Sequence, residues 1–174
     1  MEKDELIEIL KSKSADELVD ELALLSVNFT VVQDYFDLKY KSKTKPSILK
    51  KYKDKIDKAI YPDWEFNEGL NIDLVEEIIK DLSVVIPKIN DQMELEIYAI
   101  EAGNKCANDM GGDFGEDYYI YFEGLFGQTI NKLNRAKMST QLLDKIDLII
   151  NKAFEGYRHK DAVGDLWADY KENK

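Results

Sequence analysis

The sequence predicts an all-α protein, a single domain over residues 1–174 built as an irregular array of about eight or nine antiparallel amphipathic helices, like a small α–α superhelix or bundle. Three observations indicate this class. Apolar residues recur at helical spacing in almost every segment, whereas strand-like alternation does not recur. Three prolines and nine glycines among 174 residues leave little room for long loops. Capping residues and prolines stand where helices would begin or end.

Local signals define the helices of the N-terminal third. Residues 1–13 are expected to form a loosely packed N-terminal helix. Ser14 and Glu17 have the spacing of a capping box, and Thr30 with Gln33 repeats it. Pro46 suits the first turn of the following helix. The helices expected in this part span 4–11, 14–25, 30–40 and 46–61.

The remaining helices follow from similar signals. Asn71, Asn90 and Ser139 are expected to cap three of them, and Pro87 ends the first of the three. The last residues, 171–174, are expected to form a disordered tail. The helices expected in this part span 72–86, 91–109, 116–134, 140–157 and 161–170.

The net charge of −11 is distributed unevenly along the chain. Residues 1–38 carry three Lys against ten acidic side chains, a balance of −7. Residues 39–58 carry nine Lys against two acids, or +7, and residues 61–125 carry three Lys against sixteen acids, or −13. One basic segment therefore lies within an acidic field, and a negative field repels nucleic acid.

The sequence also indicates in which cellular compartment the protein is found. No charge-free run reaches the roughly 20 apolar residues of a bilayer span, and the N-terminus lacks the pattern of a signal peptide. The single cysteine, Cys106, lies in an apolar helical pattern and is expected to be a buried structural thiol. We therefore expect a soluble cytoplasmic protein without membrane contact.

Three segments carry a resemblance to a known family: KYKDKIDKAIYP (51–62), NKCANDMGGDFGEDYYIYFEGLF (104–126) and GYRHKDAVGDLWADY (156–170). They resemble an uncharacterised bacterial domain-of-unknown-function family of small all-helical proteins. The resemblance extends over most of the chain from about Leu18. It implies an all-helical fold and no particular activity, cofactor or catalytic residue. The glycine-rich MGGDFG departs from the family pattern.

The acidic segment 108–117 raises the question of metal binding. Counted from Asp109, an EF-hand loop would place oxygen ligands and glycine at positions that hold Gly111 and Phe114 here, and a Glu where Ile120 stands. We therefore predict no metal and no cofactor. The favoured interpretation is a turn between two helices in which Gly111 or Gly112 adopts the left-handed C-terminal cap.

Catalytic arrangements are scarce. No Glu-x-x-His pair of a di-iron bundle occurs, and the sole histidine, His159, lies between charged neighbours that suggest a surface turn at a helix N-terminus. The acidic pairs Glu5/Glu8 and Glu17/Asp20 stand too close in sequence to face one another from two helices as in nucleotide pyrophosphohydrolases. We predict a protein without catalytic residues.

Five lysines lie on the helix expected over 46–61. Only two arginines occur in the chain, which disfavours nucleic-acid recognition. A solvated face with weak Lys50–Asp54 and Lys53–Asp57 pairs is the favoured interpretation, and docking to an acidic patch of another protein or of a second copy is the alternative. The lysines of this tentative basic face are Lys50, Lys51, Lys53, Lys55 and Lys58.

These observations predict a non-enzymatic interaction module. An acidic surface from helices between 71 and 125 would bind a basic protein partner, and DYYIYF is too dense in aromatics for one helix face to bury, so one or two of its tyrosines should be exposed. A homo-oligomer is possible on the same grounds. The alternatives are an acidic inhibitor of the immunity type and a metal-dependent phosphohydrolase that uses Asp109, Asp113 and Asp117. The predicted interaction residues are Tyr118, Tyr119, Tyr121, Asp113, Glu116 and Asp117.

Overall fold

The computed structural model describes residues 1–40, 43–61, 70–133 and 140–173. This part of the chain contains nine α-helices, one short 3-10 turn and no strand, which confirms the all-α prediction. The helices are α1 (Lys3–Lys11), α2 (Ala15–Asn28), α3 (Thr30–Lys39), α4 (Lys45–Ile60), α5 (Ile72–Val85), α6 (Ile89–Met110), α7 (Glu116–Leu133), α8 (Thr140–Asn151) and α9 (His159–Glu172), with the 3-10 turn η1 (Gly156–Arg158) before α9.

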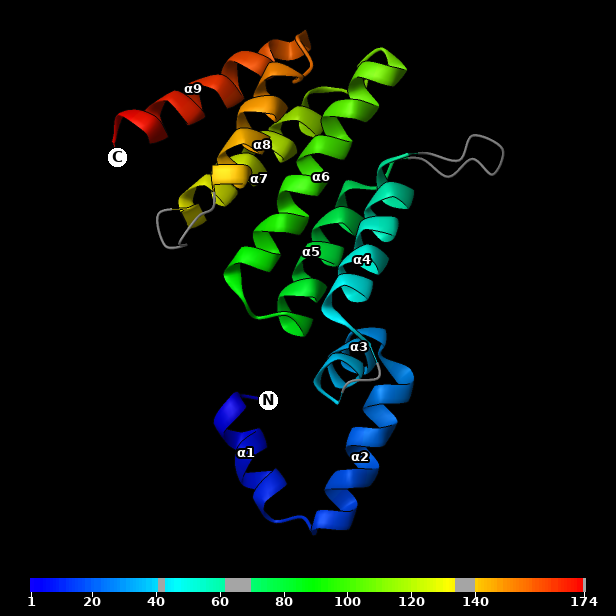
Figure 1. Cartoon of the computed structure of the whole chain (residues 1–174). Coiled ribbons are helices and arrows are strands. Elements are labelled where there is room, and N and C mark those ends of the chain that lie inside the picture. Colours follow the sequence, from blue (N-terminus) through cyan, green and yellow to red (C-terminus); the bar gives the residue numbers. More distant parts are fainter. Residues whose placement is uncertain (41–42, 62–69, 134–139, 174) are drawn as a thin grey trace.

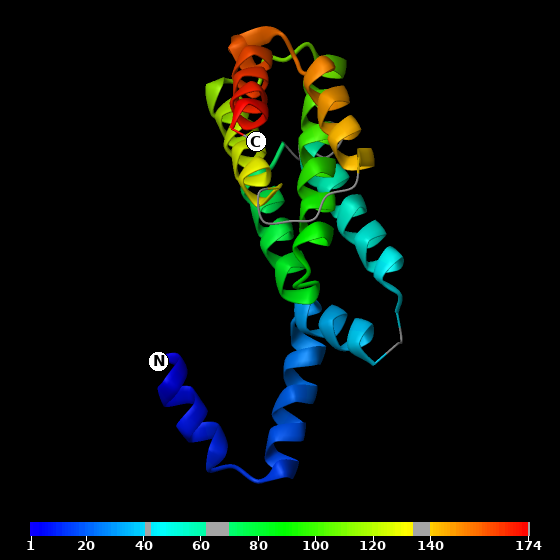
Figure 2. The same cartoon turned by 60° about the vertical axis from the view of Figure 1, so that its left-hand side comes forward.

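Helices α4 to α9 form an elongated bundle around α6 (Figures 1 and 2). Helix α6 contacts α4, α5, α7 and α8, and α9 packs against α7 and α8. At one end of the bundle α3 crosses between α2 and the pair formed by α4 and α5. Beyond α3, helices α1 and α2 extend away from the bundle as the two arms of an open V (Figure 2).

Helix α6 is the centre of the hydrophobic core. Twelve of its 22 residues are buried, because it has neighbours on several sides rather than on one face. Cys106 is fully buried, as the sequence predicts, and burial raises the pKa of its thiol. The largest fully buried side chains of the neighbouring helices are those of Tyr52, Ile48, Ile56 and Ile60 of α4, Leu82 of α5, and Tyr118, Tyr119, Phe122 and Phe126 of α7.

The predicted helix caps are right at two positions and wrong at two. Ser14 forms the full capping box, and Asn71 accepts a hydrogen bond at the start of α5. Thr30 does not cap α3, because Phe29 takes the extended conformation of the cap and Thr30 is already helical. Asn90 lies inside α6, which begins at Ile89, two residues earlier than predicted.

The C-terminal region differs most from the prediction. Helix α8 ends at Asn151 rather than at 157, and α9 begins at His159. A pair of consecutive left-handed residues, Tyr157 (φ +53°) and Arg158 (φ +58°), breaks the helical backbone directly before α9, and no α-helix accommodates such a pair. Helix α9 continues through Glu172, past the predicted start of the tail. The predicted cap at Ser139 lies outside the described residues.

Candidate functional site

The predicted interaction tyrosines do not form an exposed surface. Tyr118 and Tyr119 are each 2% exposed, so the prediction is wrong for both. The Tyr118 hydroxyl donates to the carbonyl of Gly103 on α6 at 2.7 Å, and the Tyr119 hydroxyl donates to the carbonyl of Gly112 at 2.6 Å. Tyr121 is partly buried. Consecutive tyrosines can both be buried because they have different neighbours, one on α6 and one in the α6–α7 turn.

The acidic residues of the same prediction do lie at the surface. Asp113, Glu116 and Asp117 are exposed before and within the first turn of α7. Gly111 has the left-handed conformation of a C-cap (φ +80°) at the end of α6, as predicted. Within the described residues no group of three or more His, Cys, Asp or Glu side chains is placed to hold a metal ion, so Asp109, Asp113 and Asp117 do not form such a group.

Several lysines of α4 interact with side chains of the same protein. Lys51 pairs with Asp34 of α3 at 2.7 Å, and Lys53 pairs with Glu94 of α6 at 2.7 Å. Lys55 lies over the ring of Tyr52, whereas Lys50 and Lys58 are exposed. The sequence predicted pairs along the helix. The structure shows cross-helix pairs for Lys51 and Lys53, because the two helices that flank α4 both present carboxylates to it.

Asp34 is a site residue that the sequence analysis did not single out. Its side chain is fully buried, and the Lys51 ammonium donates to both of its carboxylate oxygens at 2.8 and 2.7 Å. Lys43 lies 3.4 Å away. The available signal was an acid within the otherwise apolar or neutral run 29–36. A buried carboxylate requires such partners, since an unpaired charge in the interior is strongly unfavourable.

The N-terminal helices present a different kind of surface. Neither α1 nor α2 has a buried residue, and α2 packs against α3. Large apolar side chains are left in solvent along both helices. We call them the N-terminal apolar surface: Leu6, Ile7, Ile9, Val19, Leu22, Leu24, Leu25, Val27 and Phe29.

The same two helices also carry an excess of acidic side chains. Residues 1–28 carry eight acids against three lysines, a balance of −5. Two of the lysines, Lys11 and Lys13, are held in ion pairs with Glu8 and Glu21 at 2.7 Å. Apolar and acidic side chains therefore share these two helices, and the net charge of the segment is negative.

A second feature lies at the opposite end of the bundle, where His159 enters the core. His159 is 1% exposed, so the surface turn expected for it is wrong, although it does begin a helix as predicted. Its Nδ1 lies 2.9 Å from a carboxylate oxygen of Glu123 on α7. Its Nε2 lies 2.9 Å from the amide oxygen of Asn104 on α6. The imidazole thus connects three helices.

Aromatic stacking places His159 in this position. The ring of Tyr119 stacks on Phe154 at 5.7 Å and on Tyr157 at 4.9 Å between centroids, and lies 5.3 Å from the imidazole. The left-handed backbone at Tyr157 turns the chain so that both neighbours reach this ring. A strained backbone conformation persists only where surrounding contacts hold it in place. Here the stacking of Tyr157 on Tyr119 holds it.

Both ring nitrogens of His159 have a polar partner at hydrogen-bond distance, the Glu123 carboxylate at Nδ1 and the Asn104 side-chain amide at Nε2. The Asn104 amide then has its oxygen occupied. Its Nδ2 has no acceptor among the described residues, although Asn104 is only 5% exposed.

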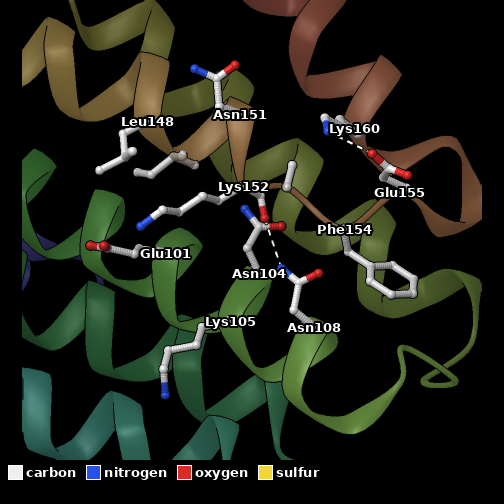
Figure 3. A pocket seen from close by; sticks show the side chains of 12 residues that line it. Glu101, Asn104, Lys105, Asn108, Leu148, Asn151, Lys152, Phe154, Glu155 and Lys160 are labelled. Carbon is white, nitrogen blue, oxygen red and sulfur yellow. Dashed lines mark hydrogen bonds and ion pairs between the residues drawn. The ribbon is translucent and has the colours of Figure 1, made fainter.

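Asn104 also lines a pocket of about 670 Å³ between α6, α8 and the α8–α9 connection (Figure 3). One wall follows α6 at the spacing i, i+3, i+4 and i+7, which places four side chains on one face. The opposite wall comes from the end of α8. Its lining includes Glu101, Asn104, Lys105, Asn108, Ile149 and Lys152.

Comparison with known proteins identifies no relative: no protein-family model, no curated protein and no solved structure matches the chain. The resemblance to an uncharacterised bacterial family therefore stays a prediction. Among the described helices, none combines the length and the apolar composition that crossing a bilayer requires.

Proposed function

We propose that the protein is a non-enzymatic interaction module that binds a basic amphipathic helix of another protein on its N-terminal apolar surface. The observation that carries the proposal is that α1 and α2 bury none of their residues while nine large apolar side chains lie in solvent. Large apolar side chains left exposed in such number on two helices favour an interaction site. The acidic partner surface expected from helices 71–125 is thereby replaced by one on α1 and α2.

The pattern of α2 favours a helix as the occupant. Leu22, Leu25 and Phe29 follow Leu18 at the spacing i+4, i+7 and i+11, so they form one stripe along the helix. An amphipathic helix laid along such a stripe buries its own apolar residues at the same spacing. Helices α1 and α2 diverge as an open V (Figure 2), and Leu22, Leu25 and Phe29 are exposed.

Charge determines the kind of partner. A balance of −5 on residues 1–28 attracts a Lys- or Arg-rich helix and repels a second copy of the same segment. The basic helix of a second copy is a poor substitute, because Lys45, Lys51 and Lys53 of α4 are paired with acids of their own chain. An acidic inhibitor of a basic protein would be one form of this function.

The proposal is tested with a synthetic helical peptide that carries Leu on one face and Lys on the other. Fluorescence anisotropy should show binding that weakens at least tenfold between about 50 and 500 mM NaCl, since the charges are exposed and screened. A peptide of the same composition in shuffled order, and one with Glu in place of Lys, should bind at least tenfold more weakly.

Paired variants locate the binding surface. Leu22→Asn with Leu25→Asn should weaken peptide binding at least tenfold without loss of helix content, since both residues are already exposed. The control is Val84→Asn with Ile120→Asn, two exposed apolar residues of α5 and α7. Equal losses in both pairs, a stable dimer by sedimentation, or preferential binding to neutral lipid vesicles would each contradict the proposal.

A further inference from the structure

We propose that the partner helix binds inside the V formed by α1 and α2, where it contacts both helices and completes a three-helix bundle with them. This binding mode rests on the proposed function and specifies the class of partner. The partner is a helix whose apolar residues cover two adjoining sides, with Lys or Arg on the third side, rather than a helix with one apolar stripe. Figures 1 and 2 both show α1 and α2 diverging from their link as an open V.

The two helices face each other with apolar side chains at the apex of the V. Every residue of α1 is exposed except Leu10 in its last turn, and Leu18 is the one apolar residue of α2 that is not exposed. Among the described residues, α1 makes no extended contact with any helix from α3 to α9. The partial burial of Leu10 therefore arises at the junction with α2. The ion pair between Lys13 and Glu21 at 2.7 Å lies at the same junction.

The faces that meet at this apex stay apolar toward the open end of the V. On α1 the positions three and four residues before Leu10 share its face. On α2 the positions four and seven residues after Leu18 share its face. All four positions hold exposed leucine or isoleucine side chains, so each arm has an apolar inner side. We call them the inner residues: Leu6, Ile7, Leu22 and Leu25.

Other exposed apolar residues of the same helices lie on different faces. Ile9 lies about 100° from Leu10 around α1, since each residue turns the helix by that angle. Leu24 and Val27 lie about 120° and about 180° from Leu18 around α2. We call Ile9, Leu24 and Val27 the outer residues. A partner inside the V leaves the outer residues in solvent, whereas a partner laid against the outside of either arm covers them.

Contact with both arms favours a partner with a wide apolar face. Only Ser12, Lys13 and Ser14 join the arms, so a partner bound to one arm meets the other at a high effective concentration. A helix with one apolar stripe covers the inner side of one arm and leaves that of the other in water. The charge balance of −5 on residues 1–28 favours basic side chains on the remaining side of the partner.

The experiment uses the full chain and two synthetic helical peptides of about 18 residues, long enough to span α2. In the one-stripe peptide Leu occupies one row of the helix, Ala an adjoining row and Lys the rest. In the two-stripe peptide Leu replaces the row of Ala. Fluorescence anisotropy should show that the two-stripe peptide binds at least tenfold more tightly.

Variants of the two arms separate specific contact from general hydrophobicity. Leu6→Gln with Ile7→Gln should abolish the tenfold preference and leave the affinity for the one-stripe peptide within twofold, since that peptide lies along α2. Glutamine keeps the helix propensity of α1, and circular dichroism verifies the helix content. The matched controls replace outer residues. Ile9→Gln, and Leu24→Gln with Val27→Gln, should keep the preference and both affinities within twofold.

Hydrogen exchange gives a second readout that does not depend on affinity. With the two-stripe peptide bound, amides of both α1 and α2 should exchange more slowly than in the free protein. With the one-stripe peptide bound, the slowing should be confined to α2.

The outcomes distinguish this binding mode from the proposed function. If the two-stripe peptide binds but α1 gains no protection, or if its advantage persists in Leu6→Gln with Ile7→Gln, the partner does not lie inside the V although the proposed function stands. Tenfold losses in the outer variants would place the partner outside the V and contradict the binding mode in the same way. An α1 as protected in the free protein as in the complex would mean that the two arms close on each other, which also overturns it. If neither peptide binds, the proposed function fails and the binding mode fails with it.

Discussion

The ring of Phe154 occupies the space where a side chain on Gly112 would be. A Cβ built on Gly112 would lie 1.9 Å from the ring, and the backbone there has φ +73°. A Cβ on Gly156 would lie 2.2 Å from the same ring. The α6–α7 turn and the α8–α9 connection are therefore held together by one aromatic ring between two glycines, in contact with Tyr119.

Replacement of Gly112 should be among the most destabilising changes in this region. Gly112→Ala adds both a steric clash and left-handed strain, so we expect the free energy of unfolding to fall by about 2–4 kcal/mol. Gly111→Ala is the matched control, since Gly111 has φ +80° with nothing within 4 Å of the added Cβ. It should lose only about 1 kcal/mol. Urea denaturation measures both, and equal losses would show that Phe154 moves aside freely.

The buried Asp34–Lys51 pair should respond asymmetrically to mutation. Lys51→Met removes the 2.7 Å partner of a fully buried carboxylate and leaves the Lys43 ammonium at 3.4 Å, so it should lower the free energy of unfolding by about 3 kcal/mol. Asp34→Asn should lose less, because the Lys51 side chain is partly exposed and can be hydrated. The control is Lys80→Met, in an exposed pair with Glu76, which should change stability by less than about 0.5 kcal/mol. A Lys51→Met variant as stable as the control would contradict the assignment.

Alkaline pH should destabilise the fold through its tyrosines. Burial and the neighbouring Tyr157 and Asp113 raise the pKa of Tyr119 from 10.0 to about 12, and burial also raises the pKa of Tyr52 and Tyr118. Between pH 10 and 12 the unfolded chain loses phenolic protons that the folded chain keeps. The stabilisation is therefore complete below pH 10 and decreases as pH rises to 12, by up to about 1.4 kcal/mol per pH unit for each phenol.

Absorbance near 295 nm and circular dichroism at 222 nm, recorded together, measure this effect. The tyrosinate signal of the buried rings should appear only as the helical signal is lost. In Tyr119→Phe the pH dependence of the unfolding free energy above pH 10 should be shallower than in the wild type. Full ionisation of all tyrosines near pH 10 with the helices intact would disprove the prediction.

Hydrogen exchange should divide the chain into three levels of protection. Amides of α6 should exchange slowest, because most of this helix is buried on several sides. Amides of α1 should exchange fastest, and those of α2 somewhat more slowly where it contacts α3. Mass spectrometry of peptic fragments resolves these levels. Protection of α1 equal to that of α6 in the isolated protein would mean that a second copy covers it.

The helical architecture was readable from the sequence because its signals are local. The capping box at Ser14 and the periodic apolar residues of α2 depend on neighbours within a few positions. Local signals of this kind do not predict that His159 is buried. Its neighbours Arg158 and Lys160 indicate a surface. Its burial depends on the left-handed turn and on contacts with Asn104 of α6 and Glu123 of α7, which are 55 and 36 residues distant in sequence.

The lysines of α4 show the same limit. Their spacing on the helix is as the sequence predicts, but the sequence indicates ion-pair partners four residues along the same helix. In the structure Lys51 pairs with Asp34 and Lys53 with Glu94, and both acids come from other helices. Periodicity identifies which residues share a face and says little about which helix meets that face. The buried tyrosines of α7 were misassigned for this reason, since each needed a different neighbouring element.

The α8–α9 connection restricts how this chain can change in length. From Phe154 to His159 the backbone has one register in which the ring meets Gly112 and the imidazole meets Glu123. An insertion or deletion of one residue between them would detach one of the two contacts. The link between α1 and α2 carries no such requirement, and insertions there would alter only the angle between two solvent-exposed helices.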